Sequence, residues 1–390
     1  MRMTLIDPEM RNLELIKEGV GPFLFYKHFG YKVSFVCYEN GSYPYLDSLV
    51  KGIDLKFIDR PQNQQETTNR FLRKILGNSV VAFLKKNSQM IDVLHLIGFS
   101  KETLIYAYVY KLYNKKGICY VRCDTDYGIV YIDYIKNPIK RNSLKYFFNK
   151  VDFYSVESTP VLNALSGKYP NVLKGLINFP VPCFFLPPDR VDNDVKKEKI
   201  ILTVARLGSH QKNTELLLRA FSRLQKEDWS LALVGPLEEQ SFNEELLSIL
   251  KKSPELEPRI LLIGEISNRE ELFKWYQKSS IFCLPSRHES FGIALLEPSY
   301  FGCFPITTGI KEIPAAYDIT KNWEYGAQFS NENEDDLLKV LEKVTSSDFD
   351  FERIRIAKEI SLYIKNTFMG KEVIQKIHDL FMKKIKNKEV

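Results

Sequence analysis

Short strand-like segments rich in apolar residues alternate with helix-like segments along almost the whole chain. In the first half the strand-like segments are residues 3–6, 32–38, 55–59, 93–97, 117–124 and 151–157, and the helical stretches lie near 21–29, 66–86, 101–113 and 139–149. In the second half the strand-like segments are 199–206, 230–235, 259–264, 280–284 and 304–307, and the helical stretches lie near 214–225, 242–252, 269–278 and 293–301. Because parallel strands need a crossover connection, usually a helix, this alternation predicts parallel sheets covered by helices on both faces.

The alternation is interrupted once, in residues 178–197. This stretch contains four prolines, at positions 180, 182, 187 and 188, and then a mixture of acidic and basic residues, which is typical of a linker. A length of 390 residues suits two or three domains. We therefore predict an α/β protein with two Rossmann-like, doubly wound parallel-sheet domains, residues 1–190 and 191–365, that face a cleft. The helical, highly charged tail is expected to end in a helix, residues 366–390, that packs back on the first domain.

One strand-like segment leads directly into two glutamates that are eight positions apart. A short loop after residues 280–284 carries Glu289, and Glu297 lies about two turns into the helix that follows. The first N–H groups of a helix have no acceptor within the helix and lie at the positive end of its dipole, so they can hold an anion. A plain helix start with an acidic first turn would show the same residues. The predicted backbone donors, in the first helical turn, belong to Ser290, Phe291, Gly292 and Ile293.

A second segment places two cations at a comparable position. Arg206 ends the strand-like segment 199–206, and Lys212 lies in the loop that leads to the next helix. Open α/β sheets bind ligands beyond the carboxyl ends of their strands. A fixed pair of positive charges there suits a diphosphate, through charge-assisted hydrogen bonds. Taken singly, each of the two residues could equally be an ordinary surface charge.

Together the two segments resemble the family-4 retaining glycosyltransferases, which use nucleotide-sugar donors and have the GT-B fold. The resemblance rests on Arg206, then Lys-Asn at 212–213 and Leu-Leu-x-Ala-Phe at 217–221, with the two glutamates about 80 residues after the arginine. It covers residues 199–365 well, and the first half only in rhythm and in two short motifs. It implies an acceptor-binding first domain and a second domain that binds the nucleotide sugar.

The resemblance implies a role for each of these residues. Arg206 and Lys212 would grip the donor pyrophosphate during catalysis, Glu289 would orient the sugar through its hydroxyls, and Glu297 would bind the ribose. The strand and loop that include Ile266 would flank the nucleobase. The departing phosphate oxygen would take the acceptor proton, so no protein general base, no metal and no cofactor besides the donor substrate is expected.

Two glycines, Gly19 and Gly21, precede or begin a predicted helix in the first half. Glycine lets the backbone approach a phosphate or a sugar closely. The resemblance implies that this is the glycine loop that touches the donor from the opposite domain. A plain turn would explain the same pattern.

Polar residues on two predicted strands of the first half are candidate contacts to the acceptor or the sugar. His95, three residues after Asp92, is similar to the family's Asp-x-x-His strand, although a histidine there can also be a packed core residue. The next strand departs from the family, because Cys123 or Asp124 stands where many relatives have a histidine. Asp124, as a catalytic candidate, or Asp126 would then hydrogen-bond the acceptor or the sugar.

Charge is distributed unevenly along the chain, whose net charge is +6. Residues 1–200 contain 29 Lys and Arg against 20 Asp and Glu, whereas residues 201–390 contain 26 against 29, so the first half is expected to meet something anionic. Residues 136–150, from Lys136 to Lys150, interleave cations with aromatic residues, which is typical of a segment on an anionic membrane surface. The alternative is a solvated helix whose apolar residues face the core. Nucleic acid is not an expected partner, because the excess is modest and no binding motif is present.

Other features exclude several classes of protein. No run of about 18 apolar residues could span a membrane, and the N-terminus lacks the apolar core of a secretion signal. We therefore expect a cytoplasmic location, on the inner face of the membrane if the bilayer contact is made. The six cysteines show no metal-ligand spacing, and Cys119 and Cys123 are expected to be buried packing.

The expected function is that of a metal-independent retaining glycosyltransferase of the hexosyltransferase type. It would move a sugar from a nucleotide-diphosphate sugar to the hydroxyl of a glycan, lipid-linked or protein acceptor, in synthesis of a cell-surface glycan, polysaccharide or glycolipid. The alternatives are a nucleotide-sugar epimerase or phosphorylase on the same scaffold, and a non-catalytic partner subunit that binds a glycan or protein. A non-catalytic subunit is expected to lose the phosphate grip, yet Arg206, Lys212, Glu289 and Glu297 are all present.

Overall fold

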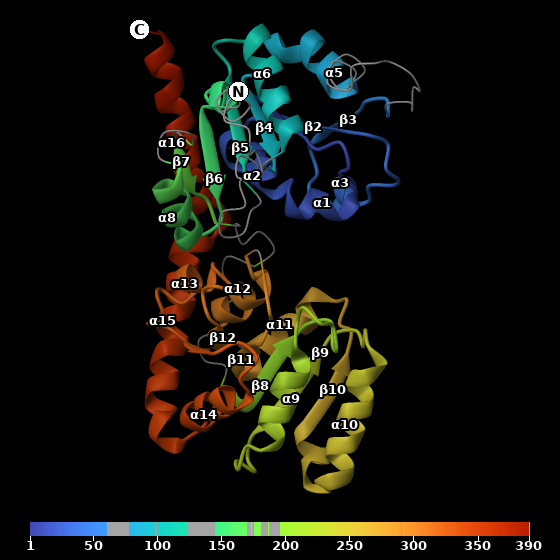
Figure 1. Ribbon diagram of the computed structural model, residues 1–390, viewed down its shortest axis with the longest axis vertical. Helices are drawn as coiled ribbons and strands as arrows, with labels where there is room; N and C mark the ends of the chain where they lie inside the picture. The colour runs from blue at the N-terminus through green and yellow to red at the C-terminus, as the bar shows by residue number, and fades with distance from the viewer. Residues whose placement is uncertain are drawn as a thin grey trace. The chain divides into compact units, whose positions relative to one another are not determined.

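The computed structural model describes residues 1–60, 78–98, 100–123, 145–169, 173, 175–180, 186, 196–289 and 291–389. It divides into two compact units, each built around its own parallel sheet (Figure 1). Unit 1 comprises Met1–Glu157, Val161–Phe184 and Gly370–Val390, and unit 2 comprises Ser158–Pro160 and Phe185–Met369. The predicted fold class, an α/β protein with two doubly wound parallel sheets and C-terminal helices, is confirmed.

Unit 1 contains a seven-stranded sheet with the order β3-β2-β1-β4-β5-β6-β7, in which all neighbouring strands are parallel. Its strands are β1 (Arg2–Ile6), β2 (Lys32–Cys37), β3 (Asp54–Phe57), β4 (Val93–Ile97), β5 (Ile118–Arg122), β6 (Phe153–Val156) and β7 (Leu176–Asn178). Its helices are α1 (Asn12–Lys17), α2 (Val20–Phe29), α3 (Tyr45–Ser48), α5 (Ser79–Asn87), η1 (Ser88–Met90), α6 (Lys101–Tyr113), α8 (Thr159–Lys168, from Val161 onward) and α16 (Gly370–Glu389).

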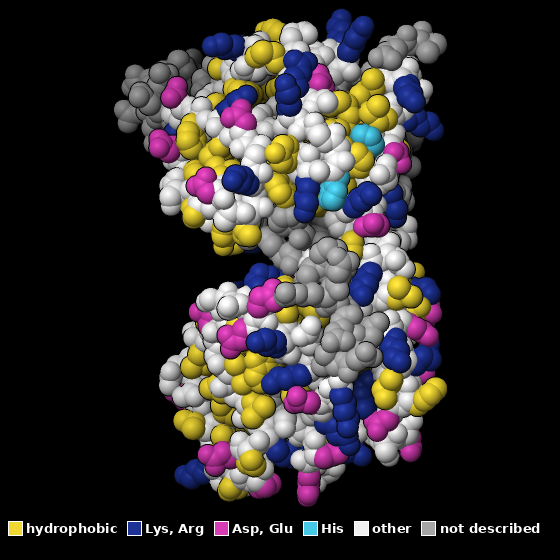
Figure 2. All heavy atoms as spheres, turned by 180° about the vertical axis from the view of Figure 1, so that it is seen from behind, with side chains coloured by type: hydrophobic (Ala, Val, Ile, Leu, Met, Phe, Trp, Pro, Cys, Tyr) yellow, Lys and Arg dark blue, Asp and Glu magenta, His cyan; other side chains and the backbone are white. Residues whose placement is uncertain are grey.

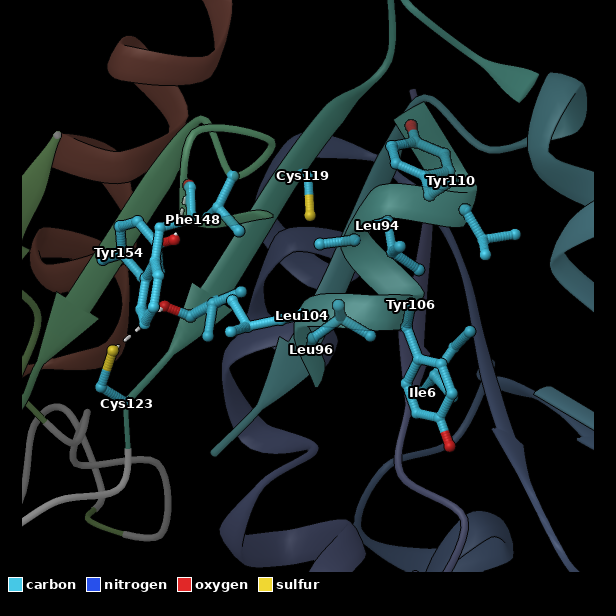
Figure 3. Packing of buried hydrophobic residues seen from close by; sticks show 14 of the residues in the cluster. Ile6, Leu94, Leu96, Leu104, Tyr106, Tyr110, Cys119, Cys123, Phe148 and Tyr154 are labelled. Atoms are coloured by element: carbon cyan, nitrogen blue, oxygen red, sulfur yellow. Dashed lines mark hydrogen bonds between the residues drawn. The ribbon is translucent and has the colours of Figure 1, made fainter. Parts of the chain in front are cut away.

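Side chains from alternate strand positions build a separate core on each face of this sheet. On one face, Leu94 and Leu96 of β4 pack with Leu104, Tyr106 and Tyr110 of α6, as Figure 3 shows. The opposite face is covered in part by α16, which is last in the sequence yet belongs to unit 1. The buried side of α16 has the three- and four-residue spacing of an amphipathic helix and consists of Val373, Ile374, Ile377 and Phe381.

Unit 2 contains a six-stranded parallel sheet with the order β10-β9-β8-β11-β12-β13. Its strands are β8 (Glu198–Val204), β9 (Ser230–Val234), β10 (Ile260–Gly264), β11 (Ser279–Leu284), β12 (Phe304–Thr308) and β13 (Ala327–Phe329). Its helices are α9 (Thr214–Ser222), α10 (Gln240–Lys252), η3 (Pro254–Arg259), α11 (Arg269–Lys278), α12 (Ile293–Tyr300), α13 (Ala316–Ile319), α14 (Glu334–Val344), η4 (Ser347–Phe349) and α15 (Asp350–Phe368).

The strand order of unit 2 reverses direction between β8 and β11. From β8 the chain adds β9 and β10 on one side, and from β11 it adds β12 and β13 on the other. Two neighbouring strands whose connections leave in opposite directions form a topological switch point, and ligands of doubly wound sheets bind beyond the carboxyl ends of such strands. A ligand site is therefore expected at the loops that follow β8 and β11.

The structure contains several elements that the alternation did not predict, among them the helices α1, α3 and α8. The strands β7 and β13 have three residues each, too few to show an alternating pattern, and neither was predicted as a defined segment. Of the predicted helices, residues 66–77 and 139–144 lie outside the described residues. Cys119 and Cys123 are buried in the core, as expected. No described helix has the length and apolar character that crossing a membrane requires.

Gly235, directly after β9, has a backbone conformation that only glycine adopts readily, with φ of 136°. A Cβ atom there would lie 1.8 Å from the backbone oxygen of Ala205 at the end of β8. We expect Gly235→Ala to lower the free energy of unfolding of unit 2 by about 3 kcal/mol, since strain and a backbone clash add.

Tryptophan fluorescence during denaturant unfolding measures this loss, because every tryptophan of the chain lies in unit 2. Gly264→Ala is the matched control: φ is 80°, but a Cβ would meet nothing within 4 Å, so a loss of only about 1 kcal/mol is expected. Equal losses in the two variants would contradict the proposed clash. The tryptophans are Trp229, Trp275 and Trp323.

Candidate active site

A lysine and a glutamate meet at the switch point of unit 2. Lys212 lies in the loop after β8, and its Nζ is 2.5 Å from Oε1 of Glu289, which lies in the loop after β11. Both side chains are largely buried, 16% and 10% exposed. The buried Ser286 hydroxyl donates to the same carboxylate oxygen at 2.7 Å, so the carboxylate is held from two sides. The structure thus brings together two residues that the sequence singled out separately.

The loop that carries Lys212 is shaped by two residues with left-handed backbone conformations, Gly208 (φ 82°) and Asn213 (φ 50°). A Cβ on Gly208 would lie 2.9 Å from Phe242. The N–H of Gly208 donates to the Thr214 hydroxyl at 2.9 Å. This tight turn ends directly at α9, which starts at Thr214. The lysine is therefore held by a compact turn between a strand and a helix.

Arg206, the second predicted cation, is half exposed at the same edge of the sheet. Its Nη1 donates to Glu238 at 2.9 Å and its Nη2 donates to the Gln211 side chain at 3.1 Å. An ion pair this exposed contributes little net stability, typically about 0–1 kcal/mol. The guanidinium can therefore exchange its carboxylate partner for an anionic ligand at small cost.

The predicted helical stretch near 293–301 is α12, which begins at Ile293, but Phe291 and Gly292, which are predicted in its first turn, precede the helix. Gly292 is the residue before the helix, with φ of 79°, and it is not part of the first turn. The first N–H groups of α12 still lack acceptors within the helix, so the start of the helix at Ile293 keeps the geometry of a backbone anion site. Phe291 is buried and packs 6.4 Å from the Phe368 ring, so it can offer a ligand only its backbone.

Glu297 is buried one turn further along α12. Its Oε1 accepts from Arg269 Nη2 at 2.5 Å, and its Oε2 accepts from the Tyr276 hydroxyl at 3.3 Å. Burial and the nearby Glu297 carboxylate raise the pKa of Tyr276, which keeps its hydroxyl a donor. The carboxylate is thus already partnered, and its predicted contact with a ribose stays a prediction.

No sequence pattern predicted a role for Arg287. In the structure its hydrogen bonds connect the loop after β11 to the loops after β8 and β13. Its N–H donates to Gln211 O at 2.8 Å, and its Nη1 donates to His210 O at 2.5 Å. Its Nε and Nη2 bind the carboxylate of Glu332, which follows β13. Gln211 Nε2 returns a hydrogen bond to His288 O at 3.0 Å. The partners of Arg287 are between 45 and 77 residues away in the sequence, so no local pattern could indicate them.

The two glycines of unit 1 have different surroundings. A Cβ on Gly19 would lie 2.4 Å from Leu15 O and 2.8 Å from the Phe35 ring, so packing alone requires a glycine there. A Cβ on Gly21, inside α2, would meet only the Phe179 ring at 3.7 Å. The predicted contact of both glycines with the sugar donor stays a prediction. The presence of a glycine at position 19 is explained by packing without a ligand.

His95 is buried in the core of unit 1, with its ring 4.6 Å from the ring of Tyr120. Its ring nitrogens have no hydrogen-bond partner among the described residues. Burial and the neighbouring Arg122 lower the pKa of His95 to about 3, so the imidazole is neutral. Arg122 pairs with Glu157 and, at 3.0 Å, with Glu18, which precedes the glycine turn. No sequence motif indicates this buried charge network.

The remaining predicted site residues are distributed as follows. Ile266 is half-buried in the loop after β10. Asp124, Asp126 and Ser290 lie outside the described residues, as does the part of the predicted membrane segment from residue 136 to 144.

Most of unit 2 is similar to a known protein family. Residues 188–360 match the family Glycosyl transferases group 1. An uncharacterized glycosyltransferase of Haemophilus influenzae is 28% identical over 173 residues, which cover 43% of this chain and 44% of that protein. The amylovoran biosynthesis glycosyltransferase AmsD of Erwinia amylovora is 30% identical over 138 residues, which cover 35% of this chain and 36% of that protein. The chain therefore spans less than half the length of these curated relatives.

Among solved structures, Anabaena HepE in complex with UDP and glucose is similar over 98% of this chain and 100% of that chain. The TM-score is 0.67 and the sequence identity is 11%, so this likeness concerns the fold. Residues 188–360, which make up most of unit 2, are thus similar to the glycosyl transferases of group 1, and the chain as a whole has the GT-B fold.

Proposed function

We propose that this protein is a retaining glycosyltransferase that moves a hexosyl group from a nucleoside diphosphate sugar to an acceptor hydroxyl. The observation that carries the proposal is the contact between Lys212 and Glu289 at the switch point of unit 2. The Lys212 ammonium, which can bind a phosphate, lies 2.5 Å from the Glu289 carboxylate, which can accept hydrogen bonds from sugar hydroxyls. A donor in which the sugar is bonded to a phosphate needs these two groups next to each other. Uridine diphosphate sugars are the first donors to test, because the similar HepE structure contains UDP.

In the proposed reaction the bond between the sugar C1 and the diphosphate oxygen breaks, and C1 bonds to the acceptor oxygen on the same face. Negative charge then builds on the diphosphate. Lys212, Arg206 and the first N–H groups of α12 would stabilise it, and preorganised donors of this kind contribute about 3 to 4 kcal/mol each. The acceptor proton passes to the departing phosphate oxygen, so the step needs neither a protein base nor a metal.

Donor binding would exchange partners at both cations. In the structure Lys212 pairs with Glu289, and Arg206 pairs with Glu238. A diphosphate competes with both carboxylates, and release of Glu289 leaves its oxygens available to accept hydrogen bonds from the sugar. Glu289 thus has a role in each state: it holds the lysine in place before binding and orients the sugar afterwards.

The acceptor is proposed to be a glycan or a lipid-linked or protein-linked saccharide, in synthesis of a surface polysaccharide or glycolipid. The relative AmsD, named for amylovoran biosynthesis, supports this class. Asp124, Asp126 and His95 stay candidates for acceptor or sugar contacts.

Lys212→Met should weaken UDP binding about 10- to 100-fold, because a charge-assisted hydrogen bond to the diphosphate is lost. Arg206→Met should act in the same direction. Isothermal titration calorimetry with UDP measures both. Glu238→Gln is the control of opposite sign: it removes a carboxylate that competes for Arg206, so UDP should bind as tightly as to the wild type or slightly more tightly. Unchanged UDP affinity in Lys212→Met would refute the assigned grip.

Glu289→Gln should lower kcat about 100-fold or more, whereas UDP affinity should stay equal or rise. The amide keeps the size of the side chain and can still accept from Ser286, but it lacks the charge that holds Lys212 and orients the sugar. Turnover is measured as UDP release from the donor sugar that a thermal-shift screen identifies. A variant with full turnover would remove Glu289 from the mechanism, even if UDP binding is as predicted.

A further inference from the structure

The amino edge of the unit 1 sheet carries a lysine-rich surface built from three segments that are far apart in the sequence. They are residues 111–117 at the end of α6 and before β5, residues 145–152 before β6, and residues 383–386 in the last turns of α16. We refer to these three segments as the amino-edge surface. Because the first two lead directly into parallel strands, this surface lies at the sheet edge opposite the carboxyl ends.

Contacts between side chains hold the three segments together. Asp152 pairs with Lys111, and its Oδ1 also lies 3.3 Å from Lys384 Nζ on α16. The ring of Tyr108, one turn before the end segment of α6, lies 6.1 Å from the ring of Tyr146. The segments therefore form one continuous surface that belongs to unit 1 alone.

The charge of the amino-edge surface is strongly positive. Its described residues include eight lysines and a single carboxylate, Asp152, which is 10% exposed and already engaged by two of the lysines. A fixed excess of positive charge on one surface attracts a partner with a high density of negative charge. The lysines are Lys111, Lys115, Lys116, Lys145, Lys150, Lys383, Lys384 and Lys386.

Large apolar side chains are exposed among these lysines. Leu112 is 56% exposed, Tyr146 is 54% exposed and Tyr113 is 39% exposed. The Lys150 ammonium lies 4.3 Å from the centroid of the Tyr146 ring. Figure 2 shows hydrophobic and basic side chains side by side at the upper end of that view, where unit 1 lies. A soluble polyanion would need only the cations, whereas exposed leucine and tyrosine among lysines suit the boundary between headgroups and acyl chains.

We propose that the amino-edge surface docks the protein on an anionic phospholipid bilayer. The exposed lysines face the headgroup phosphates, whereas the largely buried Lys111 stays paired with Asp152. Leu112, Tyr113 and Tyr146 enter the boundary with the acyl chains. Docking at the amino edge leaves the carboxyl edge of the same sheet uncovered. The proposal extends the membrane contact predicted for residues 136–150 to α6 and α16, and it does not depend on the proposed transfer reaction.

Vesicle co-sedimentation of the full-length protein tests this proposal. Binding is expected to vesicles of phosphatidylcholine with phosphatidylglycerol, to weaken at high salt, and to be far weaker to phosphatidylcholine alone. Lys115→Gln/Lys116→Gln/Lys145→Gln should lower the partition coefficient about a hundredfold, since each lysine near an anionic surface contributes about fivefold. Leu112→Ser/Tyr146→Ser should reduce the part of the binding that persists at high salt.

The end of α10 in unit 2 provides a matched control, because it carries the same residue types on another surface. Leu247 is 58% exposed, and Lys251 and Lys252 are exposed in the last turn. Leu247→Ser/Lys251→Gln/Lys252→Gln should leave vesicle binding close to that of the wild type. Circular dichroism in the near ultraviolet checks that each variant is folded.

Three results would overturn the proposal. The first is a wild-type protein that binds both kinds of vesicle equally or binds neither. The second is a control variant that loses as much binding as the three-lysine variant, which would reduce the effect to net charge. The third is wild-type binding at high salt by Leu112→Ser/Tyr146→Ser, which would show that these side chains do not enter the bilayer.

Discussion

The candidate site depends on one junction between two loops that are 77 residues apart in the sequence. Adjacent parallel strands, β8 and β11, bring the loops to the same sheet edge, and hydrogen bonds from Arg287 to Gln211 and His210 join them. Only then can Lys212 reach Glu289. The pairing of β8 with β11 sets the positions of the two loops, and the hydrogen bonds of Arg287 restrict their movement. The ion pair then fixes the side chains of Lys212 and Glu289 relative to each other. Such preorganisation is where transition-state stabilisation by fixed charges originates.

The alternation of strands and helices was enough to predict both sheets, because the connection between parallel strands almost requires a crossover helix. The residues of the site were also indicated in part. Lys212 and Glu289 follow strands, and a parallel sheet collects the ends of its strands at one edge. The contact between them was beyond prediction, since it depends on β8 and β11 being neighbours in a strand order that the sequence does not state.

Three local features show why the remainder could not be predicted. Arg287 lies in the loop before Glu289, but its role in the structure comes from its hydrogen bonds to His210 and Glu332, which are distant in the sequence. Gly19 suggested a ligand contact, whereas the Phe35 ring and a backbone oxygen already require a glycine there. Phe291 and Gly292 precede α12 and do not belong to its first turn, because the left-handed conformation of Gly292 is a property of the folded turn. Sequence patterns report periodicity and residue type, and these features depend on tertiary contacts.

The central claim is that Lys212 exchanges Glu289 for a diphosphate when the donor binds. A crystal structure of the protein with UDP tests it most directly. We expect a diphosphate oxygen within hydrogen-bond distance of Lys212 Nζ. The Glu289 carboxylate should no longer contact the lysine and should still accept a hydrogen bond from Ser286. A diphosphate bound away from the carboxyl edge of the unit 2 sheet, or an intact contact between Lys212 and Glu289 with UDP present, would contradict the account.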